Sequence, residues 1–279
     1  CSSDLKNIYI SLIYIFIIIF HRIIKIIPKS HFSFDKALEK NNQKTTLVKI
    51  GDQSLIFRTP NWITTYRAKT LETKEPETIA WINSFKPNSI FYDVGANVGI
   101  FSCYAAFKNK CEVFAFEPSP PNLEMLISNI TLNNLSERIC IIPFGLSEFT
   151  KQARIYYSRN SFSWGGAHNS VDVKINQRGE TLEDTIDVKT ISYNLDDLIR
   201  LLKLPSPRYL KIDVDGIENL ILRGCQEAFK TIESILVEND SQNKNSESEI
   251  QSILKKANFE RISFNTENQI WVKNVSGKI

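Results

Sequence analysis

The sequence predicts an α/β fold in which helices cover a mostly parallel sheet. Two observations lead to this prediction. From Phe91 onward, short runs of strand length alternate with longer segments of helical pattern. The short runs are continuously apolar, as expected for parallel strands that are buried on both faces. Repeated strand, helix, strand units of this kind are typical of a parallel sheet with helices packed on it.

Local signals support the individual elements. The second helix starts at a serine before two prolines and stops at Asn-Asn, and "LPSPR" precedes the fourth strand. The last two strands enclose a polar turn and should add an antiparallel element at one edge. In chain order we expect strand 89–94, helix 98–107, strand 111–118, helix 119–134, strand 138–145, strand 208–216, helix 217–229, strand 234–240 and a strand pair within 259–274.

The alternation of strand and helix patterns stops between Ala153 and Thr190, where the sequence is polar, contains glycines and has the pattern of hairpins. A long interruption of this kind is usually an insertion over the ligand edge of the sheet. Upstream, 46–60 has the pattern of a small hairpin, and 74–85 that of a helix starting at its proline. We expect an N-terminal segment and linker over 1–40, a small annex of hairpin and helix over 41–85, and a main domain over 86–279 with an insertion at 153–190.

The amino-acid composition limits which binding partners and which cellular compartment can be expected. A chain of 279 residues with 42% hydrophobic residues can bury one large core. The net charge of +3 arises from 34 basic and 31 acidic residues that are scattered along the chain, so nucleic acid is not expected as a partner. The five cysteines contain no CxxC pair, and we interpret them as thiols in a reducing compartment.

The N-terminal segment is almost purely apolar over 8–20, "IYISLIYIFIIIF", and basic residues follow it. This run falls short of the roughly 20 residues that span a bilayer. Because the chain begins with Cys1 rather than Met, we expect residues before it to be missing. A signal-like or interfacial helix and a membrane tether on a cytosolic enzyme both stay open. We expect a cytoplasmic protein, with residues 8–27 as a means of association with the cytoplasmic side of a membrane.

The turn "DVGANVG" follows the first strand, where open parallel sheets bind ligands. A dinucleotide site needs G-x-G-x-x-G, because a pyrophosphate lies against the backbone. Here only Gly95 and Gly99 are present, and Asp93 stands at the end of the strand. A carboxylate there repels a pyrophosphate but suits S-adenosylmethionine, which has a sulfonium, an ammonium group and no phosphate. The alternative is a capping aspartate beside a tight turn.

Glu117 ends the second strand, where an acid can accept both hydrogens of a ribose diol. Sites for NAD and for S-adenosylmethionine share this contact, so Glu117 alone does not distinguish the two cofactors. An NAD-dependent oxidoreductase therefore stays an alternative, although the missing glycines disfavour it.

Four motifs occur in order along the chain: "FYDVGANVGIFSCYAA", "VFAFEPSPPNLEMLISNI", "GLSE" and "YLKIDVDGIENLILRG". With them, residues 59–239 resemble the FkbM family of S-adenosylmethionine-dependent methyltransferases. The resemblance implies a Rossmann-like class I methyltransferase fold, with a mostly parallel seven-stranded sheet, an antiparallel last strand and helices on both faces. It also implies methyl transfer from S-adenosylmethionine to a hydroxyl of a glycan, glycolipid or other small molecule.

The resemblance further implies which residues bind the cofactor. The glycine loop would surround the methionine part, and the acid of "FEP" would hold the ribose. Carried over residue by residue, the cofactor-binding positions are Asp93, Gly95, Asn97, Gly99, Glu117 and Pro118. The chain departs from the commonest pattern at Asp215, where many relatives have Glu, so that the charge is kept while the reach is shorter.

The motif "KIDVDGIE" places carboxylates at the end of the fourth strand. Asp213 and Asp215 lie two apart, so both would project from one face of an ideal strand, and Glu218 follows in the first helical turn. In a catalytic interpretation, a carboxylate accepts the proton of the attacking hydroxyl, directly or through His168. A magnesium site formed by these carboxylates is a second interpretation, although we expect that the protein holds no metal. In a third, Glu218 only stabilises the helix N-terminus.

Methyl transfer from a sulfonium needs little beyond alignment, since proximity can supply about 7 to 11 kcal/mol of the barrier. A strong base is therefore not obligatory, and His168 can equally be a loop residue hydrogen-bonded to its neighbours. A catalytically silent methyltransferase-fold scaffold at a membrane is a further alternative. The intact Asp93, Glu117 and Asp213 argue against it.

Overall fold

The computed structural model of the protein describes residues 36, 40, 42–263 and 267–274. The chain divides into two units, Cys1–Lys44 and Thr45–Ile279. Residues 8–27, for which membrane association is expected, lie outside the described residues. Among the residues that are described, no helix has the length and apolar character needed to cross a membrane. The fold described below is that of the second unit.

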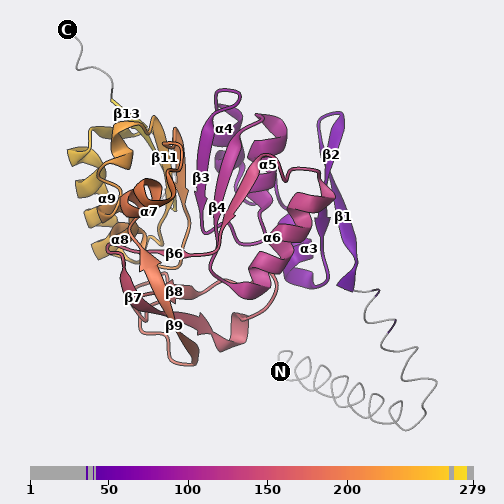
Figure 1. The fold of residues 1–279 in the computed structure, drawn as a ribbon, viewed down its shortest axis with the longest axis horizontal. Coiled ribbons are helices and arrows are strands. Elements are labelled where there is room, and N and C mark those ends of the chain that lie inside the picture. Colours follow the sequence, from indigo (N-terminus) through magenta and orange to yellow (C-terminus); the bar gives the residue numbers. More distant parts are fainter. Residues whose placement is uncertain (1–35, 37–39, 41, 264–266, 275–279) are drawn as a thin grey trace, which may run out of the picture. The chain divides into compact units, whose positions relative to one another are not determined.

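Within the described residues, seven strands form the central sheet (Figure 1). Across the sheet they are β12 (Phe259–Arg261), β13 (Asn268–Lys273), β11 (Ser234–Glu238), β10 (Tyr209–Ile212), β3 (Ile90–Val94), β4 (Glu112–Phe116) and β5 (Ile139–Ile142). All neighbouring strands are parallel except those paired with β13, the last strand of the chain. This confirms the predicted sheet. The antiparallel strand lies one position in from the edge, however, because β12 forms the edge.

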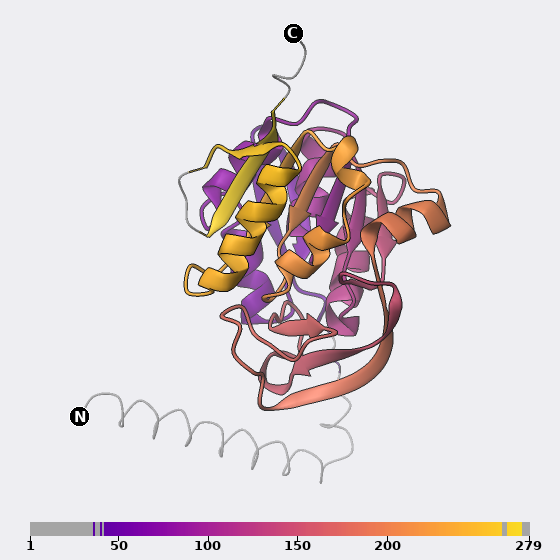
Figure 2. The same cartoon turned by 90° about the vertical axis from the view of Figure 1, so that its left-hand side faces the viewer.

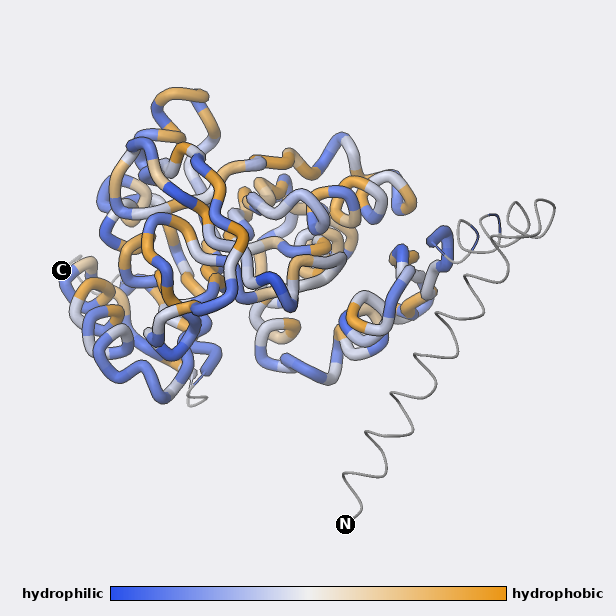
Figure 3. Tube along the Cα trace, turned by 90° about the horizontal axis from the view of Figure 1, so that it is seen from below, coloured by the Kyte–Doolittle hydropathy of each residue, from blue (hydrophilic) through white to orange (hydrophobic). Residues whose placement is uncertain are grey.

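Each face of the central sheet has its own hydrophobic core, because successive strand residues point to opposite faces. In β3, Phe91 belongs to one core and Tyr92 to the other. Side chains of α4 (Pro76–Asn83), α5 (Ile100–Lys108) and α6 (Pro120–Leu132) complete the first core, and those of α7 (Leu195–Leu202), α8 (Glu218–Arg223) and α9 (Lys244–Lys256) complete the second. Helices therefore cover both faces, as predicted. Hydrophobic and hydrophilic stretches alternate along the chain trace (Figure 3).

A second sheet of four strands lies below the central sheet in both ribbon views (Figures 1 and 2). Its strands, in order, are β6 (Gly145–Leu146), β9 (Thr185–Tyr193), β7 (Lys151–Ser158) and β8 (Asn169–Val171). Most of this sheet comes from residues 153–190, the predicted insertion. Its loops supply part of the wall of the cavity described below.

The predicted annex, residues 41–85, contains the hairpin of β1 (Thr45–Ile50) and β2 (Gln53–Arg58), together with α3 (Trp62–Lys69) and α4. The helix α3 was not predicted. Its buried residues are only Thr64 and Ala68, so it lacks the apolar stripe that marks a helix in a sequence. It begins instead at a capping box, in which Asn61 Oδ1 accepts from the backbone N–H of Thr64 at 2.9 Å.

The helix α8 is shorter than the predicted 217–229. It ends at Arg223, and a separate 3₁₀ turn, Ala228–Lys230, follows Gly224. The sequence pattern of apolar residues continues across this break, which is why the two segments read as one helix.

Candidate active site

A cavity of about 380 Å³ lies where β3, β4, β10 and β11 end. Its wall includes residues of the glycine loop, the ends of the neighbouring strands, the insertion, α3 and the segment between α3 and α4. The residues that line the cavity include Arg67, Lys74, Glu75, Gly95, Asn97, Phe101, Glu117, Pro118, Gly166, Ala167, His168, Asn169, Gln177, Asp213, Asp215 and Glu238. The cavity thus occupies the carboxyl edge of the sheet, where ligands of open α/β folds bind.

The glycine loop brings the ends of β3 and β10 together. Gly95 lines the cavity with φ +83°, and a Cβ there would stand 1.8 Å from the backbone oxygen of Asp213. Only glycine fits such a close approach. Gly99 instead starts α5, where a Cβ would meet Leu126 Cδ1 at 2.3 Å. Of the two predicted glycines, Gly95 borders the cavity and Gly99 packs against α6.

Asn97 ties the glycine loop to two other parts of the wall. Its backbone N–H donates to Glu117 Oε2 at 2.8 Å, and its Nδ2 donates to the carbonyl oxygen of Gly166 at 2.8 Å. The insertion is therefore bonded directly to the loop that should surround the cofactor.

Asp93 lies behind the cavity wall. It is 1% exposed, accepts from Ser102 Oγ at 2.5 Å, and its Oδ1 stands 4.0 Å from Lys211 Nζ with no hydrogen-bond partner in the described chain. Burial raises the pKa of Asp93. Asp93 is not among the residues that line the cavity, and its place beside the cofactor, which the resemblance implies, stays a prediction.

Glu117 does reach the cavity and is 4% exposed. Its Oε1 accepts from the backbone N–H of Ser119 and its Oε2 from that of Asn97, both at 2.8 Å. Burial raises the pKa of Glu117 to about 7, although these bonds oppose the shift. Each carboxylate oxygen keeps acceptor capacity, as a pair of ribose hydroxyls requires. Pro118, predicted beside it, also lines the cavity.

Three ionisable side chains meet at the ends of β10 and β11: the buried Lys211 and the partly buried Asp213 and Glu238. Lys211, 1% exposed, forms an ion pair with Asp213, and its Nζ lies 5.0 Å from the centre of the Phe101 ring. Burial opposes ionisation of Asp213, but Lys211 and a hydrogen bond from Glu238 hold the pKa of Asp213 well below its usual range. The charge of Asp213, together with burial, raises the pKa of Glu238 well above its usual range.

Sequence reasoning missed Lys211 and Glu238. The signal for Lys211 was a charged residue inside the apolar strand "YLKI", and that for Glu238 was an acid at the end of the fifth predicted strand. In the folded protein, both side chains lie next to Asp213, which the sequence motif already indicated.

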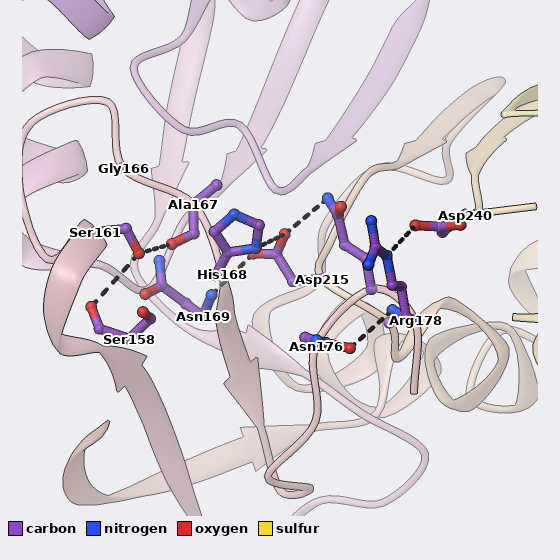
Figure 4. Close-up of polar contacts among 12 residues, drawn as sticks. Ser158, Ser161, Gly166, Ala167, His168, Asn169, Asn176, Arg178, Asp215 and Asp240 are labelled. Atoms are coloured by element: carbon purple, nitrogen blue, oxygen red, sulfur yellow. Dashed lines mark hydrogen bonds and ion pairs between the residues drawn. The ribbon is translucent and has the colours of Figure 1, made fainter. Parts of the chain in front are cut away.

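Asp213 and Asp215 both line the cavity, as their spacing suggested. Asp215 accepts from the backbone N–H of Asn169 at 2.9 Å and from Gln177 Nε2 at 3.0 Å, and burial raises its pKa. His168 Nδ1 lies 3.9 Å from Asp215 Oδ1, which is too far for a hydrogen bond (Figure 4). The His168 side chain is 52% exposed and borders the cavity.

Glu218 does not line this cavity. It is 2% exposed, its Oε1 accepts from the backbone N–H of Gly216 at 3.1 Å, and its Oε2 has no partner in the described chain. Burial raises the pKa of Glu218 to about 8. It borders a smaller cavity of about 90 Å³ instead. This placement favours the structural interpretation of Glu218 over a catalytic one.

In the described part of the chain, no group of three or more His, Cys, Asp or Glu side chains is arranged to hold a metal ion. The magnesium interpretation therefore gains no support from the positions of Asp213, Asp215 and Glu218.

The chain is similar to several curated methyltransferases. It is 26% identical over 175 residues to the hexuronic acid methyltransferase AglP of Haloferax volcanii, covering 62% of this chain and 65% of that protein. It is 25% identical over 167 residues to the 31-O-demethyl-FK506 methyltransferase FkbM of Streptomyces tacrolimicus, covering 51% of this chain and 62% of that protein. The match spans less than two thirds of the length of each of these relatives.

Solved structures resemble the chain only distantly. The fibrillarin pre-rRNA processing protein of Methanococcus jannaschii has a TM-score of 0.44 and 15% identity, covering 82% of this chain and 83% of that one. The fold assignment rests on the strand order. The family profile described as "Methyltransferase FkbM domain" matches residues 93–261, more than half of the chain. The protein therefore belongs to the FkbM family of methyltransferases.

Proposed function

We propose that the protein is an S-adenosylmethionine-dependent O-methyltransferase that acts on a hydroxyl of a glycan, glycolipid or other small molecule. The observation that carries this proposal is the buried Glu117 carboxylate, which faces the cavity at the end of β4, together with a glycine loop that offers no phosphate cradle because Gly99 packs against Leu126. S-adenosylmethionine, when bound, supplies a methyl group that its sulfonium already activates. The protein needs to hold this group and to align an acceptor with it.

The wall fits a cationic cofactor better than a dinucleotide. Glu117, Asp213 and Asp215 border the cavity, whereas Glu75 is paired with Lys74 and the raised pKa of Glu238 favours its neutral form. Such an acidic wall attracts a sulfonium and an ammonium group and repels a pyrophosphate. Gly95 allows the backbone to approach a ligand closely, whereas Gly99 packs against Leu126 and offers no phosphate cradle.

The roles of the acids at the acceptor side follow from their neighbours. Lys211 keeps Asp213 ionised, so Asp213 is a weak base and a good hydrogen-bond acceptor. We assign to it the orientation of the acceptor hydroxyl rather than its deprotonation. His168, half-exposed at the same wall, is the candidate that can pass the proton to solvent.

The names of two relatives support a hydroxyl acceptor. One is named as a methyltransferase of a hexuronic acid and the other as a methyltransferase of 31-O-demethyl-FK506. A sugar acid or another hydroxylated small molecule is therefore the first acceptor class to test.

Calorimetry with S-adenosylhomocysteine and with NAD tests the cofactor. We expect binding of S-adenosylhomocysteine and a large loss of affinity in Glu117→Ala. Binding of NAD without binding of S-adenosylhomocysteine would instead support the oxidoreductase alternative. Incubation with labelled S-adenosylmethionine and a hydroxylated glycan fraction then identifies the acceptor. Binding without any transfer would support the scaffold alternative.

A further inference from the structure

The two side chains of the cavity wall that carry a permanent positive charge, Arg67 and Lys74, differ in their partners. Lys74 Nζ forms an ion pair with Glu75 Oε1 at 2.8 Å. Arg67 uses only its Nε, which donates to the carbonyl oxygen of Gly165 at 3.0 Å. No carboxylate in the described part of the chain pairs with the Arg67 guanidinium. A half-buried cation thus borders a ligand cavity with its terminal nitrogens available.

The position of Arg67 is fixed by the contacts of α3 with the loop that carries Gly165. Asn61, the N-cap of α3, donates through Nδ2 to the carbonyl oxygen of Trp164 at 2.8 Å. The backbone N–H of Gly165 donates to Asn122 Oδ1 at 2.9 Å. A Cβ on Gly165 would already stand 3.0 Å from Ile63 Cγ2, so helix and loop are in close contact. The guanidinium is therefore oriented before any ligand binds.

A guanidinium whose Nε is already engaged presents Nη1 and Nη2 as a planar fork. This fork matches the two oxygens of a carboxylate, and such charge-assisted pairs are among the strong hydrogen bonds of proteins. Partial burial makes an unpaired cation costly, so an anion from the ligand would remove that cost. The other wall residues do not serve this purpose, because Lys74 is already neutralised by Glu75 and the remaining charged side chains are mainly acids.

We propose that Arg67 is the carboxylate-binding residue of the cavity. This inference rests on the proposed function. Two ligands could bring the carboxylate: the methionine part of the cofactor, or an acidic sugar as the methyl acceptor. The chemistry at Arg67 is the same in both cases, and binding experiments separate them.

The experiment is calorimetry on the full chain and on Arg67→Gln. S-adenosylhomocysteine and 5′-methylthioadenosine share the adenosine thioether, but only the first carries a carboxylate. If Arg67 binds the cofactor, Arg67→Gln weakens S-adenosylhomocysteine by about ten-fold to a hundred-fold and 5′-methylthioadenosine by less than about two-fold. If Arg67 binds the acceptor, both ligands keep their affinity, while D-glucuronate loses its advantage over D-glucose in the S-adenosylhomocysteine complex.

Two further variants keep the comparison interpretable. Arg67→Lys keeps the charge and loses the fork, so it should retain part of the affinity, and it replaces Arg67→Gln if that variant does not fold. Lys69→Gln removes an exposed charge from the same helix outside the cavity wall and should change nothing.

Equal weakening of S-adenosylhomocysteine and 5′-methylthioadenosine by Arg67→Gln would overturn the inference, as would unchanged binding of every probe. A failure of the unchanged protein to bind either adenosine thioether is a different result. It would overturn the proposed function itself, and the inference with it.

Discussion

Lys211 and Asp213 form an ion pair at the edge of the cavity. Lys211 is 1% exposed and lies behind the cavity wall, whereas Asp213 lines the cavity. Lys211 lies in β10 and Asp213 directly follows the last residue of this strand, so the end of β10 places the two side chains next to each other. Lys211 also stands 4.0 Å from Asp93 Oδ1 at the end of β3. The buried Lys211 therefore compensates the charge of two carboxylates at the ends of neighbouring strands: Asp93 behind the cavity wall and Asp213 in it.

Removing this cation should destabilise the fold strongly. We expect Lys211→Met to lower the free energy of unfolding by about 3–5 kcal/mol, because it leaves the buried Asp93 and the partly buried Asp213 without their partner. Urea denaturation measures this loss. Lys86→Met is the matched control: Lys86 forms an exposed pair with Glu233, and such pairs contribute about 0–1 kcal/mol. Similar small losses in both variants would contradict the central role of Lys211.

Because Gly95 closely approaches the backbone of Asp213, Gly95→Ala should be far more damaging than an alanine substitution at an uncrowded glycine. Gly95→Ala places a Cβ 1.8 Å from a backbone oxygen at φ +83°, so we expect it to disrupt the site and abolish binding of S-adenosylhomocysteine. Gly51→Ala is the control, since φ is +61° there and nothing lies within 4 Å. It should cost only the about 1–2 kcal/mol of a left-handed alanine. Thermal unfolding and calorimetry check both, and equal effects would refute the steric argument.

Most of the central sheet could be predicted from the sequence, because its strands are short, apolar and bounded by turn residues. The acid at the end of β4, Glu117, and the glycine turn after β3 were found for the same reason. Both stand where a strand must end beside a ligand edge.

The parts that were missed depend on contacts between distant segments. Arg67 reaches the cavity from α3, a helix that buries only two residues and shows no apolar stripe. Lys211 is tolerated in an apolar strand only because Asp93 and Asp213 approach it in three dimensions. The burial of Asp93 behind the wall could not be predicted either, because only its charge and its place at the strand end are visible in the sequence.

Glu218 predicts a pH dependence of stability. Its pKa is raised by burial from 4.5 to about 8 in the folded protein. The folded state therefore binds more protons than the unfolded state between these values, and the contribution of Glu218 to stability falls as pH rises from 4.5 to 8. Glu218→Gln removes this ionisation and should be more stable than the unchanged protein at pH 9 by about 1–2 kcal/mol. Urea denaturation at pH 5 and pH 9 tests this, and a difference that does not grow with pH would contradict it.

Glu117 predicts a pH dependence of ligand affinity. A ribose diol donates two hydrogens, so it needs the ionised carboxylate, and the pKa of Glu117 is raised by burial to about 7. The affinity for S-adenosylhomocysteine should therefore rise as pH increases through about 7 and level off above it. Glu117→Gln keeps the shape of the side chain but lacks the second acceptor, so it should bind more weakly and lose the pH dependence. Calorimetry between pH 6 and pH 8.5 measures both proteins, and a variant that retains the full dependence would show that another group at the wall controls binding.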